Sequence, residues 1–295
     1  MDQAKTPRPR RSALYAPGAN ARALEKTRQV DADVFILDLE DAVAPEAKAE
    51  ARANVRRFLQ QGKPAGRELV VRVNGLDSLW CRDDVAAVID LQADAILVPK
   101  INGAEDVARA EAMLAAAGKE ARPTLWCMIE TPLAILNLQA IAQRAPAAVW
   151  VMGTNDLVKE LRAAHTPERR PLLYALGAAL MAARAYGIAV LDGVHNDIAD
   201  LEGLERSCEQ GRAMGFDGKT LIHPSQVAAC NRVFSPDPQA VLQARRIIAA
   251  FAREENAGKG VLQVDGKMVE LLHAEMAQAT LAIAEAIAAR EQSTG

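Results

Sequence analysis

Eight short apolar runs recur along this chain, and longer Ala-rich segments with helical spacing separate them. Uninterrupted runs of Val, Ile and Leu are typical of parallel strands buried on both faces, and the segments between them are typical of crossover helices. The runs are Ser12–Ala16, Val34–Glu40, Leu69–Asn74, Ala95–Lys100, Thr124–Glu130, Val149–Gly153, Ala189–Val194 and Thr220–His223. Strand and helix therefore alternate, which predicts an α/β fold.

Eight alternations favour a closed (β/α)8 TIM barrel over an open doubly wound sheet. The open sheet usually carries a Gly-rich turn after its first strand, but no G-x-G-x-x-G pattern follows the first run here. We therefore predict a barrel over residues 11–235 of the 295. Residues 236–295 are expected to form a C-terminal helical extension, a cap or oligomer arm of the same domain, with helices over Gln239–Glu255 and Met268–Arg290.

Charge and composition argue against a nucleic-acid or membrane partner. A net charge of -3 does not suit a phosphate-backbone binder, and an aromatic content of 4% leaves little for base stacking. The four cysteines include no close pair of the kind a zinc knuckle or redox motif needs. No secretory signal and no apolar run of about 18 residues is present, so we expect a cytoplasmic protein.

Polar residues follow the apolar runs at their carboxyl ends, which is where the active site of a TIM barrel lies. Asp38 and Glu40 end the second run, and Arg72 and Asn74 end the third. Because side chains alternate along a strand, each pair is expected to share one face. Further acids end the fifth run and follow the sixth. The sequence therefore predicts an acidic site with an arginine at one rim.

Several carboxylates at one rim repel one another unless they are protonated or neutralised by a cation. Hard oxygen ligands without clustered His or Cys favour Mg²⁺ over zinc, and Mg²⁺ usually takes one or two protein carboxylates. Glu130 and Asp156, on neighbouring strands, suit that role. A helix N-cap is the competing interpretation for Asp156 and for Asp41.

Two other motifs carry weaker signals. Gly218-Lys219-Thr220 imitates the end of a phosphate-binding loop, but Ala213 stands where that loop needs glycine, and we reject it. Lys100 has the position of a lysine that could form a Schiff base with a carbonyl substrate, although a structural or phosphate-binding role is favoured.

Seven motifs in order along the chain carry a family resemblance. They are Arg11–Gly18, Leu37–Val43, Arg72–Asn74, Val98–Lys100, Met128–Pro132, Gly153–Leu157, and Gly218-Lys219 with Ile222–Pro224. Together they resemble the citrate lyase β-subunit and malyl-CoA/citramalyl-CoA lyase family. The resemblance implies a TIM-barrel enzyme, usually a homotrimer, that uses Mg²⁺ to cleave or form a carbon–carbon bond beside a CoA or acyl-carrier thioester.

The resemblance also implies roles for particular residues. Glu130 and Asp156 would bind the metal, and Arg72 would contact the substrate carbonyl. The residues that would contact CoA are Tyr15, Arg22 and Lys26. Arg22 and Lys26 stand four apart, so one helix face would present both to pyrophosphate.

One segment departs from the family pattern. Members with lyase activity resemble Gly-Lys-Met-Ile-Asp after the barrel, where the Asp reaches a neighbouring subunit's site as general base, but this chain has Gly266 to Glu270 ending in Glu. Glu270 keeps the carboxylate and adds a methylene, and a misplacement of ~1 Å can cost ~100-fold in rate. We expect a reshaped pocket, with Glu270 as base, or a different activity.

These observations predict metal-assisted cleavage of a 3-hydroxyacyl-CoA thioester, with a carboxylate at the hydroxyl carbon, to an acyl-CoA and a 2-keto acid. Three alternatives stay open. The chain could be a citrate lyase β-subunit acting on an acyl-carrier thioester, a class II aldolase acting on free keto acids, or a non-catalytic binding barrel.

Overall fold

The computed structural model describes residues 8–116, 123–144 and 149–292, so the last three residues of the predicted extension lie outside the described part. The chain divides into two compact units. One runs from Arg10 to Phe234, and the other contains the segment from Ser235 onward. Within the described residues, no helix is both long and apolar enough to cross a membrane.

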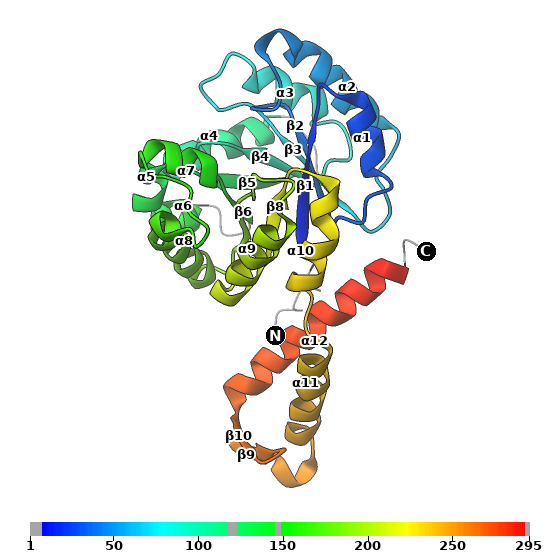
Figure 1. The fold of residues 1–295 in the computed structure, drawn as a ribbon, viewed down its shortest axis with the longest axis vertical. Helices are drawn as coiled ribbons and strands as arrows, with labels where there is room; N and C mark the ends of the chain where they lie inside the picture. Colours follow the sequence, from blue (N-terminus) through cyan, green and yellow to red (C-terminus); the bar gives the residue numbers. More distant parts are fainter. Residues whose placement is uncertain (1–7, 117–122, 145–148, 293–295) are drawn as a thin grey trace. The chain divides into compact units, whose positions relative to one another are not determined.

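Eight parallel strands close into a barrel in chain order, each beside the next and β8 beside β1 (Figure 1). They are β1 Ser12–Pro17, β2 Val34–Asp38, β3 Glu68–Arg72, β4 Ala95–Val98, β5 Thr124–Ile129, β6 Val149–Met152, β7 Ala189–Asp192 and β8 Gly218–Leu221. Every predicted run forms one of these strands. The prediction of a (β/α)8 TIM barrel is therefore confirmed.

Helices surround the strands in Figure 1. They are α1 Ala21–Thr27, η1 Pro45–Ala47, α2 Lys48–Gln60, α3 Cys81–Val88, α4 Ala104–Ala115, α5 Pro132–Leu136, α6 Leu138–Arg144, α7 Thr154–Glu160, η2 Arg170–Leu172, α8 Leu173–Ala185, α9 Leu201–Met214, η3 Pro224–Gln226 and α10 Val227–Phe234. Local sequence sets their ends. The Thr131 side chain accepts the N–H of Ala134 at the start of α5, and Gly215 ends α9 with a φ of 105°.

Side chains of the strands alternate between two apolar layers. On β2, Val34 and Ile36 belong to the cluster inside the barrel, whereas Phe35 and Leu37 pack toward the helices. The interior cluster contains Ala13, Val34, Ile36, Val70, Ala95, Leu97, Trp126, Met128, Val149, Val151 and Leu191. Asp38, two residues beyond Ile36, continues the inward face, so the same alternation that fills the core delivers polar groups to its open end.

The second unit contains a hairpin that the sequence interpretation missed. Its elements are α11 Pro238–Phe251, η4 Glu254–Asn256, β9 Val261–Val264, β10 Lys267–Glu270 and α12 Leu271–Gln292. Asp265 and Gly266 both have positive φ and form the turn between the antiparallel strands β9 and β10. Because Met268 belongs to β10, the helix predicted to begin there begins three residues later, at Leu271. Asp-Gly between apolar residues is a hairpin signal. Glu270 ends β10.

A buried charge cluster joins β7 to β8. Lys219 Nζ lies 2.9 Å from Asp192, whose carboxylate also accepts from Arg169 Nη1 at 2.7 Å. Both Asp192 and Lys219 are 0% exposed. Gly218 lets the backbone at Arg10 pass close to β8, because a Cβ at Gly218 would stand 1.8 Å from the Arg10 carbonyl oxygen. This Gly-Lys pair is structural, which agrees with rejecting it as a phosphate loop.

Replacing Lys219 by Met should lower the free energy of unfolding by about 3 kcal/mol, because it leaves a buried carboxylate with one partner fewer. The matched control is Lys63→Met. Lys63 also lies 2.9 Å from an aspartate, Asp94, but is one third exposed, and its loss should cost under about 1 kcal/mol. Urea denaturation measures both, and equal losses would contradict the assignment.

Candidate functional site

A cavity of about 320 Å³ opens at the carboxyl end of the barrel. Its lining is Tyr15, Asp38, Asp41, Ala42, Arg72, Met128, Glu130, Met152, Gly153, Thr154, Asn155, Asp156, Val194, Thr220 and Ile222. Strand register brings these residues together: Asp38 pairs with Arg72 across β2 and β3, and Ile129 pairs with Met152 across β5 and β6. Of the predicted site residues, Tyr15, Arg72, Glu130 and Asp156 all line this one cavity.

Glu130 is a buried carboxylate without a side-chain donor. It is 1% exposed, and the N–H of Lys100 donates to its Oε1 at 2.8 Å. Within the described part of the chain, no side chain donates a hydrogen bond to it. Burial and then the nearby charge of Asp156 raise the pKa of Glu130 to about 7. A buried acid in this state needs a proton or a cation.

Gly153 is what allows Glu130 to lie here. A Cβ at Gly153 would stand 2.3 Å from Glu130 Oε2, so any other residue would displace the carboxylate. The glycine precedes α7, and Asp156 occupies the first turn of that helix, although the cap position itself belongs to Gly153. The N-cap interpretation of Asp156 is therefore wrong, and its carboxylate stands at the same cavity as Glu130.

The donor set fits Mg²⁺. No group of three or more His, Cys, Asp or Glu that could hold a metal ion occurs among the described residues. That is unlike a zinc or calcium cage, but Mg²⁺ needs only one or two carboxylates and keeps water or substrate oxygens in its other positions. Glu130 and Asp156 could provide such a pair, and the missing counter-charge at Glu130 is what a cation would supply.

Arg72 neutralises the opposite side of the cavity. Its Nε and Nη2 each lie 2.7 Å from an oxygen of Asp38, a bidentate pair. Its Nη1 lies 2.8 Å from Glu40 and 3.4 Å from Asp41, and its guanidinium stacks 4.9 Å from the ring centroid of Tyr15. All three nitrogens of the guanidinium thus have carboxylate partners.

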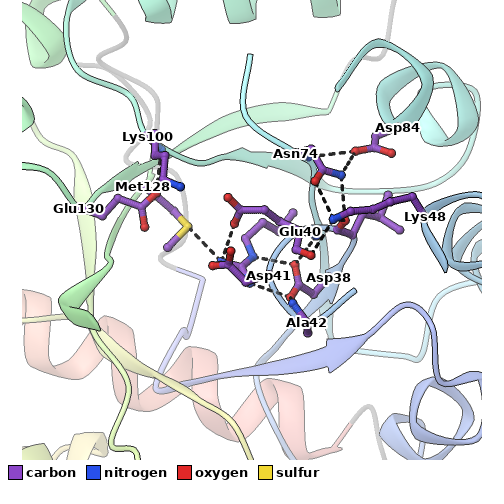
Figure 2. A network of polar contacts seen from close by, with 12 residues as sticks. Asp38, Glu40, Asp41, Ala42, Lys48, Asn74, Asp84, Lys100, Met128 and Glu130 are labelled. Atoms are coloured by element: carbon purple, nitrogen blue, oxygen red, sulfur yellow. Dashed lines mark hydrogen bonds and ion pairs between the residues drawn. The ribbon is translucent and has the colours of Figure 1, made fainter. Parts of the chain in front are cut away.

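Glu40 lies in the loop after β2 and is buried with its charge only partly balanced. Burial raises its pKa to about 8, although Arg72 acts in the opposite direction. Figure 2 shows Asp38, Glu40 and Asp41 grouped together, with Lys100 and Glu130 across the site. At neutral pH this carboxyl group can therefore hold or release a proton.

A polar network that the sequence interpretation missed supports this loop (Figure 2). Lys48 Nζ donates to the carbonyl oxygens of Leu39 and Glu40, both at 2.8 Å, and to Asn74 Oδ1 at 2.7 Å. Asn74 in turn donates to Asp84. The expectation that Asn74 shares a site with Arg72 is wrong, because β3 ends at Arg72 and Asn74 lines a neighbouring cavity.

The remaining predicted residues are not among those that line the cavity. Arg22 and Lys26 are exposed on α1, and Glu270 belongs to the second unit. Lys100 has an exposed side chain that lines the neighbouring cavity with Glu40 and Asp41. The CoA and general-base assignments of Arg22, Lys26 and Glu270 therefore stay predictions.

Two family models match the sequence. The HpcH/HpaI aldolase/citrate lyase model covers residues 11–224, which is most of the barrel. The chain belongs to this family. A second model, a carbon–carbon bond lyase of the TIM-barrel fold, covers residues 169–288. The resemblance seen in the motifs is confirmed, and the chain is an enzyme of a family of carbon–carbon lyases.

Relatives within and near this family differ in their named reactions. The chain is 50% identical over 281 residues to a (3S)-malyl-CoA thioesterase of Cereibacter sphaeroides, covering 95% of this chain and 96% of the relative. It is 36% identical over 298 residues to the citrate lyase subunit beta of Escherichia coli, covering 99% and 98%. CitE of Mycobacterium tuberculosis, solved with magnesium, acetoacetate and coenzyme A, superposes with a TM-score of 0.75 at 28% identity, covering 93% of this chain and 97% of that one.

Glu130→Gln should stabilise the metal-free protein at high pH. The raised pKa means that the folded state favours protonated Glu130. Ionisation of Glu130 therefore costs the fold nothing below about pH 4.5, and the free energy of unfolding falls as the pH rises toward and through about 7. In EDTA at pH 8.5 the glutamine should therefore raise the free energy of unfolding by about 1–3 kcal/mol, with little gain at pH 5. Urea denaturation at both pH values measures it, with exposed Glu160→Gln as control, and equal changes at the two would contradict it.

Proposed function

We propose that this enzyme uses Mg²⁺ to cleave a carbon–carbon bond of malyl-CoA-like thioesters. The substrate would be a 3-hydroxyacyl-CoA with a carboxylate on the hydroxyl carbon, and the products an acyl-CoA and a 2-keto acid. The observation that carries the proposal is Glu130, a buried carboxylate without a cationic partner, beside Asp156 in a cavity faced by Arg72.

Glu130 and Asp156 would hold the metal, which when bound supplies Lewis-acid activation of the substrate's hydroxyl and carboxylate oxygens. The Lys100 N–H fixes one Glu130 oxygen, and Gly153 leaves room for the other. The magnesium in CitE of Mycobacterium tuberculosis supports a divalent ion for this fold. Asp38 holds Arg72 by Nε and Nη2, and Nη1 contacts Asp41 and Met128, which both line the cavity.

The cleavage needs a base and an anion-stabilising donor. A carboxylate takes the hydroxyl proton, the carbon–carbon bond breaks, and its electron pair moves onto the thioester as an enolate, which Arg72 stabilises as charge develops. Protonation of the enolate carbon then gives the acyl-CoA. Glu270 is the base that the family resemblance implies, and Glu40, whose pKa of about 8 permits either protonation state, is the alternative base within the barrel.

Hydrolysis of the thioester is the second candidate, because relatives half identical to this chain are named (3S)-malyl-CoA thioesterases. Here water would attack the thioester carbonyl, the carbon–sulfur bond would break, and the products would be the free hydroxy acid and CoA thiol. The same Arg72 would stabilise the oxyanion. The two reactions therefore share a substrate and differ in which bond breaks.

Substrate contacts and assembly follow as further parts of the proposal. Tyr15, Arg22 and Lys26 would contact CoA; Tyr15 does line the cavity, beside Arg72. The CoA bound to CitE of Mycobacterium tuberculosis supports CoA as the thioester carrier, and an acyl-carrier protein is the alternative that the sequence analysis left open. A homotrimer and a cytoplasmic location remain predictions from the sequence.

Incubation with malyl-CoA and Mg²⁺ should release glyoxylate and acetyl-CoA, and EDTA should abolish the release. Glu130→Ala and Asp156→Ala should each lower kcat/KM by at least about 100-fold, since removing even an outer partner of a metal ligand costs 10–100-fold. Chromatography of the CoA products with a glyoxylate assay measures the reaction, and Glu160→Ala serves as the exposed control.

The product pattern decides between the candidates. Free CoA and malate without glyoxylate would establish hydrolysis and overturn the lyase proposal. Turnover that persists in EDTA and in the Glu130 variant would overturn the metal site.

Glu270 provides a separate test of the base. Glu270→Gln should lower kcat by about 100-fold with little change in KM, because general base catalysis typically contributes 10²–10⁴-fold. Glu270→Asp should retain activity. Steady-state kinetics measure both, and an unchanged kcat in Glu270→Gln would move the base to Glu40.

A further inference from the structure

Lys100 adopts a backbone conformation that residues with a side chain rarely take. It directly follows Pro99 after β4, and its φ is 54°, in the left-handed region. Glycine enters this region freely, whereas a Cβ brings a steric cost. Such strain persists only where surrounding contacts impose it, and it concentrates at functional sites.

Contacts from the following loop impose this conformation. Asn102 Nδ2 donates to the carbonyl oxygen of Lys100 at 3.0 Å. Asn102 is itself held by three contacts: its N–H donates to Asp106 at 2.9 Å, its carbonyl accepts from Asn137 Nδ2 at 2.8 Å, and its side chain accepts from the Thr131 hydroxyl. The turn is therefore over-determined, and Lys100 has little freedom to relax.

The Lys100 N–H donates to Glu130 Oε1 at 2.8 Å. This N–H lies in the peptide plane that Lys100 shares with Pro99. Because Asn102 holds the Lys100 carbonyl on the other side, a residue that cannot keep the positive φ would have to tilt this plane and displace the N–H. Pro99 has no N–H to offer, so Lys100 carries the first backbone donor after the strand. No side chain among the described residues donates a hydrogen bond to Glu130. The Lys100 N–H is therefore the donor that orients the Glu130 carboxylate.

We propose that Lys100 is a positioning residue that orients the Glu130 carboxylate through its left-handed backbone. The inference rests on the proposed function, in which Glu130 binds the metal. The exposed ammonium of Lys100 lines the neighbouring cavity, but its charge also lowers the pKa of Glu130, which burial raises. A test of the backbone role must therefore compare variants that both lack the ammonium. Any residue that tolerates positive φ should then support the site.

The test compares Lys100→Asn with Lys100→Val. Both remove the ammonium, but Asn tolerates the left-handed region and a β-branched Val does not. Mn²⁺, a spectroscopic substitute for Mg²⁺, is titrated into the full chain without substrate, and free Mn²⁺ is followed by electron paramagnetic resonance. Asn should bind Mn²⁺ within about 3-fold of the unchanged protein, and Val at least about 10-fold more weakly.

Arg162 provides the matched control. It is exposed and has a φ of 53°, and its N–H donates to the Lys159 carbonyl rather than to an acid. Arg162→Asn and Arg162→Val should leave Mn²⁺ affinity unchanged. Thermal unfolding checks that each variant is folded. If Lys100→Val does not fold, Lys100→Ala replaces it and should show a smaller loss in the same direction.

The outcomes separate the two proposals. Equal Mn²⁺ affinity of the Asn and Val variants, with Glu130→Gln abolishing binding, overturns the positioning role and leaves the metal site standing. Absence of Mn²⁺ binding by the unchanged protein, or binding that Glu130→Gln does not affect, overturns the metal site and the inference with it.

Discussion

The chemistry at the open end of this barrel depends on which of its buried carboxylates are paired with a cationic side chain and which are not. On one side Asp38 and Arg72 are neighbours in the register of β2 and β3, which places them in reach of a bidentate pair. On the other side Glu130 lies against Gly153 with only a backbone N–H as donor. The cavity therefore has one side where Arg72 balances the carboxylate of Asp38, and another where Glu130 has no cationic partner among the described residues.

Such an arrangement costs stability, and the rest of the barrel offsets it. Asp192 is as deeply buried as Glu130, yet Lys219 and Arg169 satisfy it, and burial is outweighed by these cations so that its pKa is lowered. The two acids also face different layers: Asp192 shares the helix-facing side of β7 with Val190, whereas Glu130 continues the inward side of β5 after Met128. The barrel thus pairs one buried acid fully and leaves another without a counter-ion. The energetic cost of the unpaired carboxylate falls at the cavity, where a bound cation would reduce it.

The sequence predicts those features that depend on burial. Parallel strands buried on both faces leave continuous apolar runs, so all eight were recognisable, and the acids at their ends, Glu130 among them, marked the mouth. Lys48 gave no signal, since a lysine in a helix is usually exposed, and its buried contacts depend on a loop geometry that only the closed barrel creates. Asn74 was misplaced because alternation holds within a strand, and β3 ends at Arg72. The sequence did not predict the left-handed conformation of Lys100 either, because glycine is the residue that usually indicates a positive φ.

Carbon–carbon cleavage and thioester hydrolysis place nearly the same demand on the barrel. Each needs a donor at the thioester oxygen, which Arg72 can supply, and an anchored hydroxy acid, which Glu130 and Asp156 can orient through an ion. They differ in the proton that is removed: cleavage begins at the substrate hydroxyl, and hydrolysis begins at a water molecule. The choice therefore lies with the base and with the exclusion of water, and not with the ligands of the ion. Glu270 stands where the lyase pattern has a shorter acid, so if Glu270 is the base that the family resemblance implies, the departure falls on one of these two determinants.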